Sequence, residues 1–450
     1  MERIVLRPVA RRPSELLLPG GLLRRLNISP GAVYMIKAGG SSAQAVVKSG
    51  AAPAATGGLR AKLRLPGRAL PLWIAAVGET VYLGPFLGIL ARRQPLRRYG
   101  EQNGFFKRLI REAHKRHICA FVFEPDDVSL TRGLVRGRTP GKESDWAEAF
   151  YPVPDVVFDR GFFKKGELPR ITRLRERLNE SFGTLLFNGA LGNKWQMYNF
   201  LMGEPDLHAH LPHTELVADG HIEEMLDKYK MVYIKPVNGN QGRHIHQVTR
   251  LGKKLLVKVH TRRGHFRTVV LGSVRELPRL LRATGEKCPF LMQEGIRLLK
   301  VGGRTADLRA LVQKGAAGKW ALTGVGVRMG PRAGIVSNLH AGGRALKVGA
   351  FLKAAGKRMD IKELNRRIEE LAVKVATILD NHALLGELGV DLGLDGKGNL
   401  WVIEVNMRPG RATFNRAGLL KAWRRSGVAP LLFSLYLWQG KMAGNGGGGG

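Results

Sequence analysis

The spacing of hydrophobic residues changes near residue 96. Before that point, short apolar runs such as 33–36 and 78–83 alternate with glycine, serine and proline, and no long helical period occurs. Runs of this kind are typical of short strands joined by turns. We therefore expect a β-rich N-terminal unit over residues 1–95, in which the small-residue tract 49–58 forms a surface loop.

From about residue 96 onward, helical and strand periods alternate. The apolar residues between Phe105 and Ala113 have the i, i+3, i+4 spacing of a helix that packs on one side. Short apolar runs at 118–123 and 155–158 follow, each with the length of a buried strand. This order predicts a small α/β domain over residues 96–185.

The rest of the chain, residues 186–445, predicts a larger domain of mixed helices and strands, so the fold class is α/β or α+β. An apolar stripe from Ile361 to Ile378 indicates a helix packed on a core. Strands are expected at 231–236, 245–249, 254–260, 290–294, 307–313 and 321–328. The glycines at 446–450 predict a disordered tail.

Composition and charge narrow the class of protein. Of the 450 residues, 44% are hydrophobic and 24% are charged, which excludes collagen-like and wholly disordered chains. The formal net charge of +37 would attract anionic polymers, but the basic residues are spread along the whole chain, which favours a solvated basic surface. Two cysteines, no apolar leader and no membrane-spanning run predict a soluble, cytoplasmic protein.

The strongest chemical signal lies in residues 386–406. Two apolar runs flank the sequence Gly-Lys-Gly-Asn, a pattern that predicts a β-hairpin in which Asp391 lies opposite Glu404. Asn406 then falls on the same face as Glu404. Carboxylate and amide oxygens suit Mg²⁺, so we predict a metal site. The alternative is a solvated sheet face, with Leu400 and Val402 beside an incidental acidic pair.

A second signal follows the predicted strand at 231–236. Lys235 precedes the loop Val-Asn-Gly-Asn-Gln-Gly-Arg at 237–243, whose glycines can offer backbone N–H groups to an anion. This composition suits a lid that closes over phosphates, although a surface hairpin fits it equally well. Neither a Walker A motif nor a dinucleotide-binding G-x-G-x-x-G motif occurs.

Taken together and in order, these residues resemble an ATP-grasp enzyme, and more narrowly the YheC/YheD-like ATP-grasp family associated with endospore coats. The resemblance covers about residues 75–440. It is carried by Asn193-Lys194-Trp195, Ile234-Lys235-Pro236, Asp307-Leu308-Arg309 with the five residues that follow, Ser337-Asn338-Leu339-His340 and Glu404-Val405-Asn406. It implies that an ATP-grasp domain over residues 186–445, with a lid at about 215–290, follows the two smaller units along the chain.

The resemblance also implies a role for each candidate residue, with ATP and one or two Mg²⁺ ions as cofactors (Mn²⁺ could replace Mg²⁺). The metal ligands would be Asp391, Glu404 and Asn406. The phosphates of the nucleotide would contact Lys194 and Lys235 and would be covered by the loop residues Asn238, Gly239, Gln241 and Gly242. The adenine would contact Gln293, Glu294 and Gly295. Asn338 would contact a phosphate or the metal. Arg309 and Arg328 would stabilise charge on the transferred phosphoryl group. The acidic residue that commonly holds the ribose is missing, because Arg297 and Lys300 occupy its region.

The implied activity is that of an ATP- and Mg²⁺-dependent ligase. An unidentified acceptor carboxylate would form an acylphosphate, and an amine would then displace phosphate to leave an amide-type bond. Two alternatives stay open: a nucleotide-binding structural protein of the spore with little turnover, and a binder of anionic polymers. The resemblance also implies association with the spore or its coat.

Overall fold

The chain begins with a closed barrel of seven strands. A computed structural model describes residues 1–95, 98–141, 145–218, 221–238, 244–260, 266–283, 288–332, 334–335, 337 and 343–444. Around the barrel the order is β1–β5–β2–β4–β3–β7–β6. The strands are β1 Glu2–Val9, β2 Glu15–Leu18, β3 Val33–Ala38, β4 Ser41–Ser49, β5 Ala54–Thr56, β6 Leu70–Val77 and β7 Thr80–Gly84. Two short helices, α1 (Gly20–Arg25) and α2 (Gly57–Leu63), accompany them.

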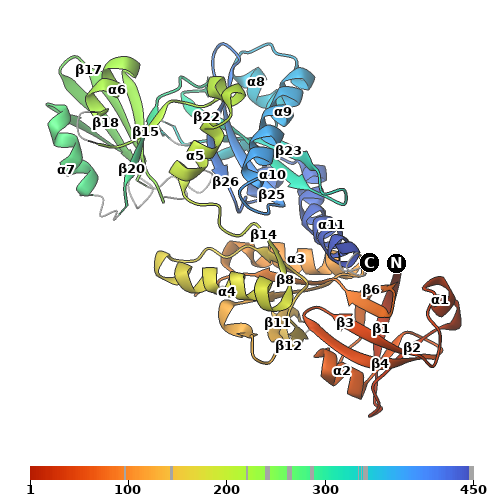
Figure 1. The fold of residues 1–450 in the computed structure, drawn as a ribbon. Coiled ribbons are helices and arrows are strands. Elements are labelled where there is room, and N and C mark those ends of the chain that lie inside the picture. The colour runs from red at the N-terminus through yellow and green to blue at the C-terminus, as the bar shows by residue number, and fades with distance from the viewer. Residues whose placement is uncertain are drawn as a thin grey trace.

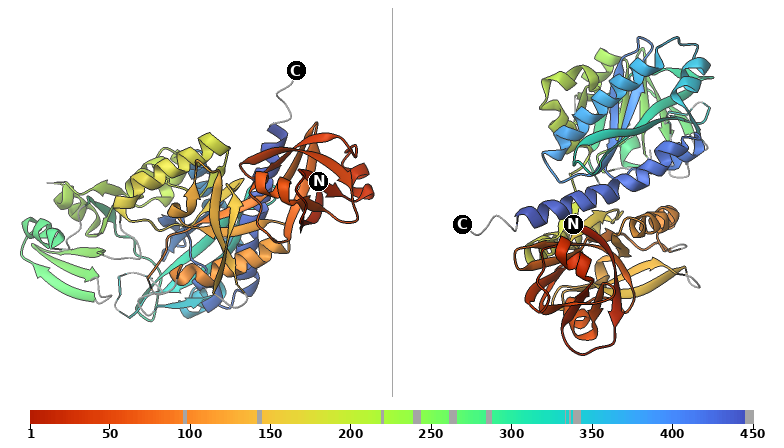
Figure 2. Two further views of the ribbon diagram at one scale, coloured as in Figure 1. Left: turned by 90° about the horizontal axis from the view of Figure 1, so that it is seen from below. Right: turned by 90° about the vertical axis from the view of Figure 1, so that its right-hand side faces the viewer.

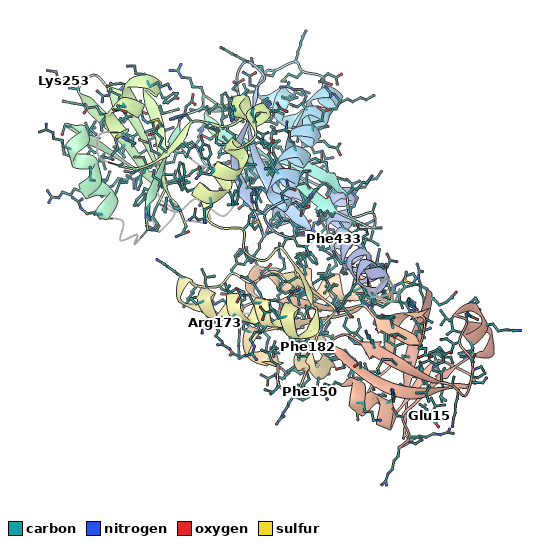
Figure 3. The ribbon with its side chains drawn as sticks, in the orientation of Figure 1. Glu15, Phe150, Arg173, Phe182, Lys253 and Phe433 are labelled. Carbon is teal, nitrogen blue, oxygen red and sulfur yellow. The ribbon has the colours of Figure 1, made fainter. Side chains whose placement is uncertain are left out.

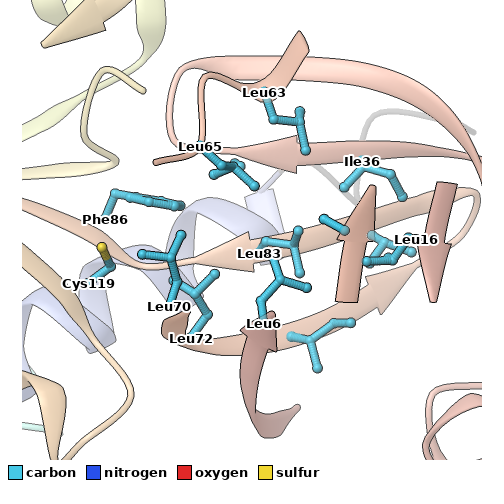
Figure 4. Packing of buried hydrophobic residues seen from close by; sticks show 14 of the residues in the cluster. Leu6, Leu16, Ile36, Leu63, Leu65, Leu70, Leu72, Leu83, Phe86 and Cys119 are labelled. Carbon is cyan, nitrogen blue, oxygen red and sulfur yellow. The ribbon is translucent and has the colours of Figure 1, made fainter. Parts of the chain in front are cut away.

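The barrel interior is filled by alternate side chains of its strands. Leu6, Leu16, Ile36, Leu72 and Leu83 are buried together, as Figure 4 shows. Because side chains alternate along a strand, the residues between them face outward. The sequence therefore predicts the β-rich character of this unit correctly.

The expected surface loop over 49–58 is wrong in its second half. Ala54–Thr56 forms the buried strand β5, which pairs with β1 and β2. Its alanines and threonine have no bulky apolar side chains, so hydrophobic periodicity does not mark the strand. Thr56 instead accepts a hydrogen bond from the backbone N–H of Glu15 at 2.9 Å inside the barrel.

The second unit is built on a seven-stranded sheet. The strands are β8 Phe86–Leu90, β9 Cys119–Phe123, β10 Val128–Ser129, β11 Leu134–Pro140, β12 Trp146–Pro152, β13 Val156–Asp159 and β14 Leu185–Phe187. The helices are α3 (Asn103–His114) and α4 (Leu168–Phe182). Strands β8, β9, β13 and β14 pair in parallel, and every residue of β8 and β9 is buried, as expected where both faces are covered. Strand β8 precedes residue 95 in the chain but belongs to the sheet of the second unit. The domain division at residue 95 stays a prediction.

Two further sheets complete the fold. The sheet in the region of the predicted lid, which we call the lid sheet, has the order β15–β20–β16–β17–β18–β19 and is antiparallel throughout. Its strands are β15 Thr214–Leu216, β16 Met231–Pro236, β17 His246–Leu251, β18 Lys254–His260, β19 Phe266–Leu271 and β20 Phe290–Glu294, with helices α6 (His221–Tyr229) and α7 (Leu277–Arg282). Figure 1 shows this part in green at one end of the molecule.

The C-terminal sheet lies between the lid sheet and the second unit in the elongated molecule (Figure 1). Its order is β24–β23–β22–β25–β26, with β21 paired to β22. The strands are β21 Lys300–Val301, β22 Arg304–Lys314, β23 Trp320–Met329, β24 Arg344–Leu346, β25 Glu387–Leu394 and β26 Leu400–Asn406. The helices are α5 Lys194–Met202, α8 Val348–Ala354, α9 Ile361–Asp380, α10 Ala412–Arg416 and α11 Leu420–Gly444.

Helix α9 covers one face of the C-terminal sheet. Leu364, Ile368, Leu371 and Val375 are buried along it, which confirms the predicted stripe except at its first residue, Ile361, which is exposed. Asp360 begins the helix by accepting the backbone N–H of Lys362 at 2.8 Å. Among the described residues, no helix is both long and apolar enough to cross a membrane.

Helix α11 connects the C-terminal sheet to the second unit. Figure 2 shows it running between the two halves of the molecule, and it contacts α3, β13 and β22. Phe433, at this junction in Figure 3, packs edge-on against Phe187 with ring centroids 5.3 Å apart. Its neighbours Leu431 and Trp438 are buried in the same cluster as Phe106.

This packing gives a stability prediction. Phe433→Ala removes a buried aromatic ring and leaves a cavity, so we expect the free energy of unfolding to fall by about 3–5 kcal/mol. Leu420→Ala, at an exposed position of the same helix, is the control and should change it little. Urea unfolding followed by circular dichroism measures both; equal midpoints for the two variants would contradict the packing role.

Candidate functional site

Alternation along the C-terminal sheet separates an apolar face from a charged one. In β22, Leu308, Ala310 and Val312 pack into the core beneath α9. The residues between them, including Asp307 and Arg309, therefore face the opposite side of the sheet. The sheet thus presents charged side chains on the face opposite α9, which α10 and α11 cover in part.

Asp391 lies at the centre of this charged face. Its carboxylate accepts hydrogen bonds from Arg309 (Nη2 to Oδ2, 2.8 Å) and from the side-chain amide of Asn406 (3.0 Å), and it pairs with Arg328 at 2.8 Å. Burial acts to raise the pKa of Asp391, but the two arginines outweigh it and hold the pKa below its usual value. The carboxylate is therefore ionised and bound on several sides.

The hairpin of β25 and β26 places Asp391 opposite Glu404, as predicted, but through a different register. Leu394, not Asp395, pairs with Leu400, and a bulge between the pairs Leu392–Val402 and Asp391–Glu404 restores the predicted partner. Asp395 accepts backbone N–H groups within the turn. An extra residue on one strand is a feature that hydrophobic alternation does not reveal.

The same bulge changes which residues of β26 lie on the same side of the sheet as Glu404. Leu400 and Val402 are buried in the core on the α9 side, whereas Glu404 and Asn406 lie with Asp391 on the charged side. The expectation that the two apolar residues share the face of Glu404 is therefore wrong. The three predicted metal ligands therefore share the charged face.

Two lysines approach the carboxylates from other elements. Lys194, at the start of α5, lies with its Nζ 3.5 Å from Oε1 of Glu404. Lys235, on β16, donates to the side-chain oxygen of Gln293 at 2.9 Å, and Gln293 donates to Thr214 at 2.9 Å. Burial lowers the pKa of Lys235 to about 8, although Glu404 acts in the opposite direction.

The segment after β20 links the lid sheet to the C-terminal sheet. The backbone N–H of Glu294 donates to the carbonyl of His213 at 2.8 Å, and that of Gly295 donates to Met231 at 2.9 Å. These two N–H groups are therefore engaged within the protein. A role of Gln293, Glu294 and Gly295 at an adenine stays a prediction.

A cavity of about 1560 Å³ lies between the lid sheet, the C-terminal sheet and the second unit. Its wall includes most of the candidate residues: Lys194, Lys235, Gln293, Glu294, Arg309, Arg328, Asp391, Glu404 and Asn406. Asn238 is exposed and, like Gly295, is not part of the wall. Gly239, Gln241, Gly242 and Asn338 lie outside the described residues.

Two buried clusters of charge, one at Glu387 of β25 and one at Asp159 of β13 in the second unit, contain residues that sequence reasoning missed. Glu387 is fully buried and is shared by Arg160 (2.6 Å) and Arg411. Asp159, also fully buried, is shared by Arg175 (2.9 Å) and Arg408 (3.1 Å). The sequence could have marked Asp159 and Arg160 as candidate site residues. They lie at the carboxyl end of a buried parallel strand, which is where α/β folds bind ligands.

Asp307 is a third buried carboxylate. The sequence marks it only as part of the Asp307-Leu308-Arg309 motif and predicts no role for it. It accepts a hydrogen bond from Nε of Arg328 at 2.7 Å and another from the hydroxyl of Ser337. Burial raises its pKa above the usual value, and the neighbouring Asp391 acts in the same direction. Arg328 therefore bridges Asp307 and Asp391.

A magnesium ion needs several oxygen ligands. Among the described residues, no group of three His, Cys, Asp or Glu side chains could hold a metal. A site here would therefore combine Asp391 with the amide oxygen of Asn406, whose nitrogen donates to Asp391, and with the partly exposed carboxylate of Glu404. Hard cations accept such mixed oxygen ligands, so the residues fit Mg²⁺. The metal assignment stays a prediction.

The separate lid sheet, the C-terminal sheet and the cavity between them define the fold of an ATP-grasp protein. The chain matches the YheC/D-like ATP-grasp family over residues 183–437, more than half its length, and therefore belongs to that family. The family and the ATP-grasp fold implied by the motifs are thus confirmed.

Two proteins of Bacillus subtilis (strain 168) are similar in sequence. Endospore coat-associated protein YheD is 28% identical over 348 residues, which cover 76% of each chain. Endospore coat-associated protein YheC is 25% identical over 298 residues, 65% of this chain and 81% of YheC. The similarity to YheD therefore extends beyond the matched family region.

Among solved structures, D-alanine-D-alanine ligase from Coxiella burnetii is 13% identical with a TM-score of 0.46, and the similarity covers 80% of this chain and 98% of that one. ATP-grasp ligase PsnB, solved with a phosphomimetic variant of its minimal precursor, Mg and ADP, is 14% identical with a TM-score of 0.43. That similarity covers 79% of this chain and 99% of PsnB.

The shared carboxylate of Glu387 gives a prediction about stability. Glu387→Gln leaves Arg160 and Arg411 buried without a counter-charge, so we expect a loss of about 3–5 kcal/mol in the free energy of unfolding. Glu363→Gln is a matched control, because Glu363 pairs with Arg366 on the exposed side of α9, and it should leave the unfolding curve unchanged. A denaturant titration that gave the same midpoint for Glu387→Gln and the unmodified protein would contradict the role of this pair.

Proposed function

We propose that the protein is an ATP- and Mg²⁺-dependent carboxylate–amine ligase that acts through an acylphosphate. The observation that carries the proposal is the convergence of Lys194, Lys235, Arg309, Arg328 and the Asp391 cluster on one cavity in a member of an ATP-grasp family. Phosphoryl transfer needs positioning and charge neutralisation more than a nucleophilic side chain. This wall offers both.

Each group around the cavity has a part in the proposed reaction. Lys194 and Lys235 neutralise the phosphates of ATP, and Asp391, Glu404 and Asn406 would hold one or two Mg²⁺ ions. A bound divalent cation neutralises phosphate charge and aligns the phosphates for transfer. Because burial weakens screening by water, each positive charge in this wall acts strongly on an anion.

Arg309 and Arg328 stabilise the group in transfer. A carboxylate oxygen of the acceptor attacks the γ-phosphorus, the bond from phosphorus to the β–γ bridging oxygen breaks, and ADP leaves. An amine then attacks the acyl carbon of the acylphosphate, phosphate departs, and the amine loses a proton. The two guanidiniums are held by Asp391 and Asp307, so they are in position before charge develops.

The location in the cell and the partners belong to the same proposal. Two relatives are named as endospore coat-associated proteins, which supports an association with the spore or its coat after synthesis in the cytoplasm. The net charge of +37 supports a further attraction to anionic polymers. A nucleotide-binding coat protein with little turnover is the competing function.

The metal assignment is tested by Glu404→Gln. The substitution keeps the size of the side chain and removes its charge, so we expect Mg²⁺-dependent ADP release to fall at least about a hundredfold. The assay measures ADP with a panel of carboxylates and amines. Glu370→Gln, on the exposed side of α9, should retain full activity.

The outcomes of this assay separate the two functions. Unchanged ADP release in Glu404→Gln would contradict the metal role. ATP binding without ADP release for any acceptor pair would favour the structural nucleotide-binding protein.

The lowered pKa of Lys235 predicts a pH dependence of nucleotide binding. The lysine loses its positive charge as pH rises through about 8, and an ATP analogue binds the charged form more tightly. We therefore expect its Kd to rise above pH 8, by up to about tenfold per pH unit. Lys235→Arg keeps its charge over this range and should give a flat profile. Identical profiles from pH 7 to 9.5 for both proteins would rule out this role of Lys235.

A further inference from the structure

The cavity is larger than one nucleotide requires. Pockets for a single ligand of drug size are typically about 300–1,000 Å³, whereas this one is about 1560 Å³. The part described above, between the lid sheet and the C-terminal sheet, faces Lys235 and Glu404. A second part extends to the second unit and is walled by α3, the end of β13, α10 and α11. This part has room for another ligand.

The wall of the second part has more positive than negative charge, because, among the described residues, Arg108, Arg160, Arg408, Arg411 and Arg416 line it together with one carboxylate, that of Glu101. The buried carboxylates of Glu387 and Asp159 are each shared between two arginines. One carboxylate balances only one guanidinium, so each group carries a net positive charge. Such an excess, with Arg160 and Arg411 buried, favours an anion in the adjoining space.

Arg108, on α3, faces the same space without a carboxylate partner. Its guanidinium lies 3.6 Å from the ring centroid of Trp423, from α11, which fixes the plane of the guanidinium. Within the part of the chain that the structure describes, no acidic side chain forms an ion pair with Arg108, and its buried Nε has no hydrogen-bond partner. Burial lowers the pKa of Arg108 below its usual value, Arg411 lowers it further, and Glu112, one turn along α3, acts in the opposite direction. An anion would relieve both effects.

Aromatic rings stand beside the unpaired arginine. Phe105 lies under Arg411 with the guanidinium carbon 4.3 Å from the ring centroid, and it also lines the cavity. Phe162 lines the cavity with 49% of its surface exposed. An exposed ring in a concave wall is a surface that an apolar part of a ligand can cover.

We infer that this second part of the cavity binds the acceptor through an anionic group other than the carboxylate that reacts, held by Arg108 on Trp423, with Phe105 and Phe162 against an apolar part of the molecule. The acceptor class is thus an amphipathic molecule with two acidic groups. The inference rests on the proposed ligase function, because it identifies the ligand as the acceptor. The second acidic group is a carboxylate or a phosphate, since both match a planar guanidinium.

The test uses three small probes and calorimetry. Phenylphosphate and phenylacetate carry the two anions, and 2-phenylethanol is the uncharged analogue. The full chain is titrated with its nucleotide site filled by Mg²⁺ and a non-hydrolysable ATP analogue. We expect at least one anionic probe to bind roughly tenfold or more tightly than 2-phenylethanol, and the probe that does so identifies the anion.

Variants of one helix separate the specific contact from general charge. Arg108→Gln should remove the preference for anions, and Arg108→Lys should retain part of it. Arg111→Gln removes the same charge from an exposed position of α3 that does not line the cavity, and it should bind as the unmodified protein does. Thermal melting checks that every variant is folded, and the Kd of the ATP analogue should be the same in all of them.

Two results would overturn the inference: an unchanged anion preference in Arg108→Gln, or no preference for either anion in the unmodified protein. The same titrations on nucleotide-free protein keep the two proposals apart. If the ATP analogue does not bind, the ligase function fails, while the comparison of Arg108→Gln with Arg111→Gln still decides whether an anion site exists.

Discussion

A carboxylate that is removed from water must be matched by hydrogen-bonding cations, and this requirement organises the centre of the protein. Asp391, Glu387 and Asp159 are nearly or fully buried, and each is bound by two arginines. Removing one partner from such a group costs several kcal/mol, because the other charge is left uncompensated. The pairs therefore hold the strands that carry them in one arrangement.

The same pairs connect parts of the chain that are distant in sequence. Arg160, from the second unit, reaches Glu387 at the start of β25, and Arg408, after β26, reaches Asp159 at the end of β13. Helix α11 adds an apolar connection at the same junction, where Phe433 packs on Phe187. The second unit and the C-terminal sheet thus share both a charged and an apolar contact, and the cavity lies beside them.

Much of the site could be predicted because its residues are close in sequence. A hairpin brings Asp391 and Glu404 together through local pairing, and the alternation of β26 places Asn406 beside them. The bulge in this hairpin could not be predicted, since an extra residue in one strand leaves no mark in the hydrophobic alternation. The short strand β5 was missed for a related reason, because alanine and threonine are buried there by the closure of the barrel and not by their own hydrophobicity.

By itself, the sequence determined the family, many of the helices and strands, and a local cluster of oxygen-bearing side chains. These properties rest on motifs and on periodicities of two and 3.6 residues, which act over short distances along the chain. Only the tertiary structure decided which arginines neutralise which carboxylates and left Arg108 without an acidic partner among the described residues. Arg160 and Glu387 are 227 positions apart, and no local pattern can indicate that burial will bring those two charges into contact.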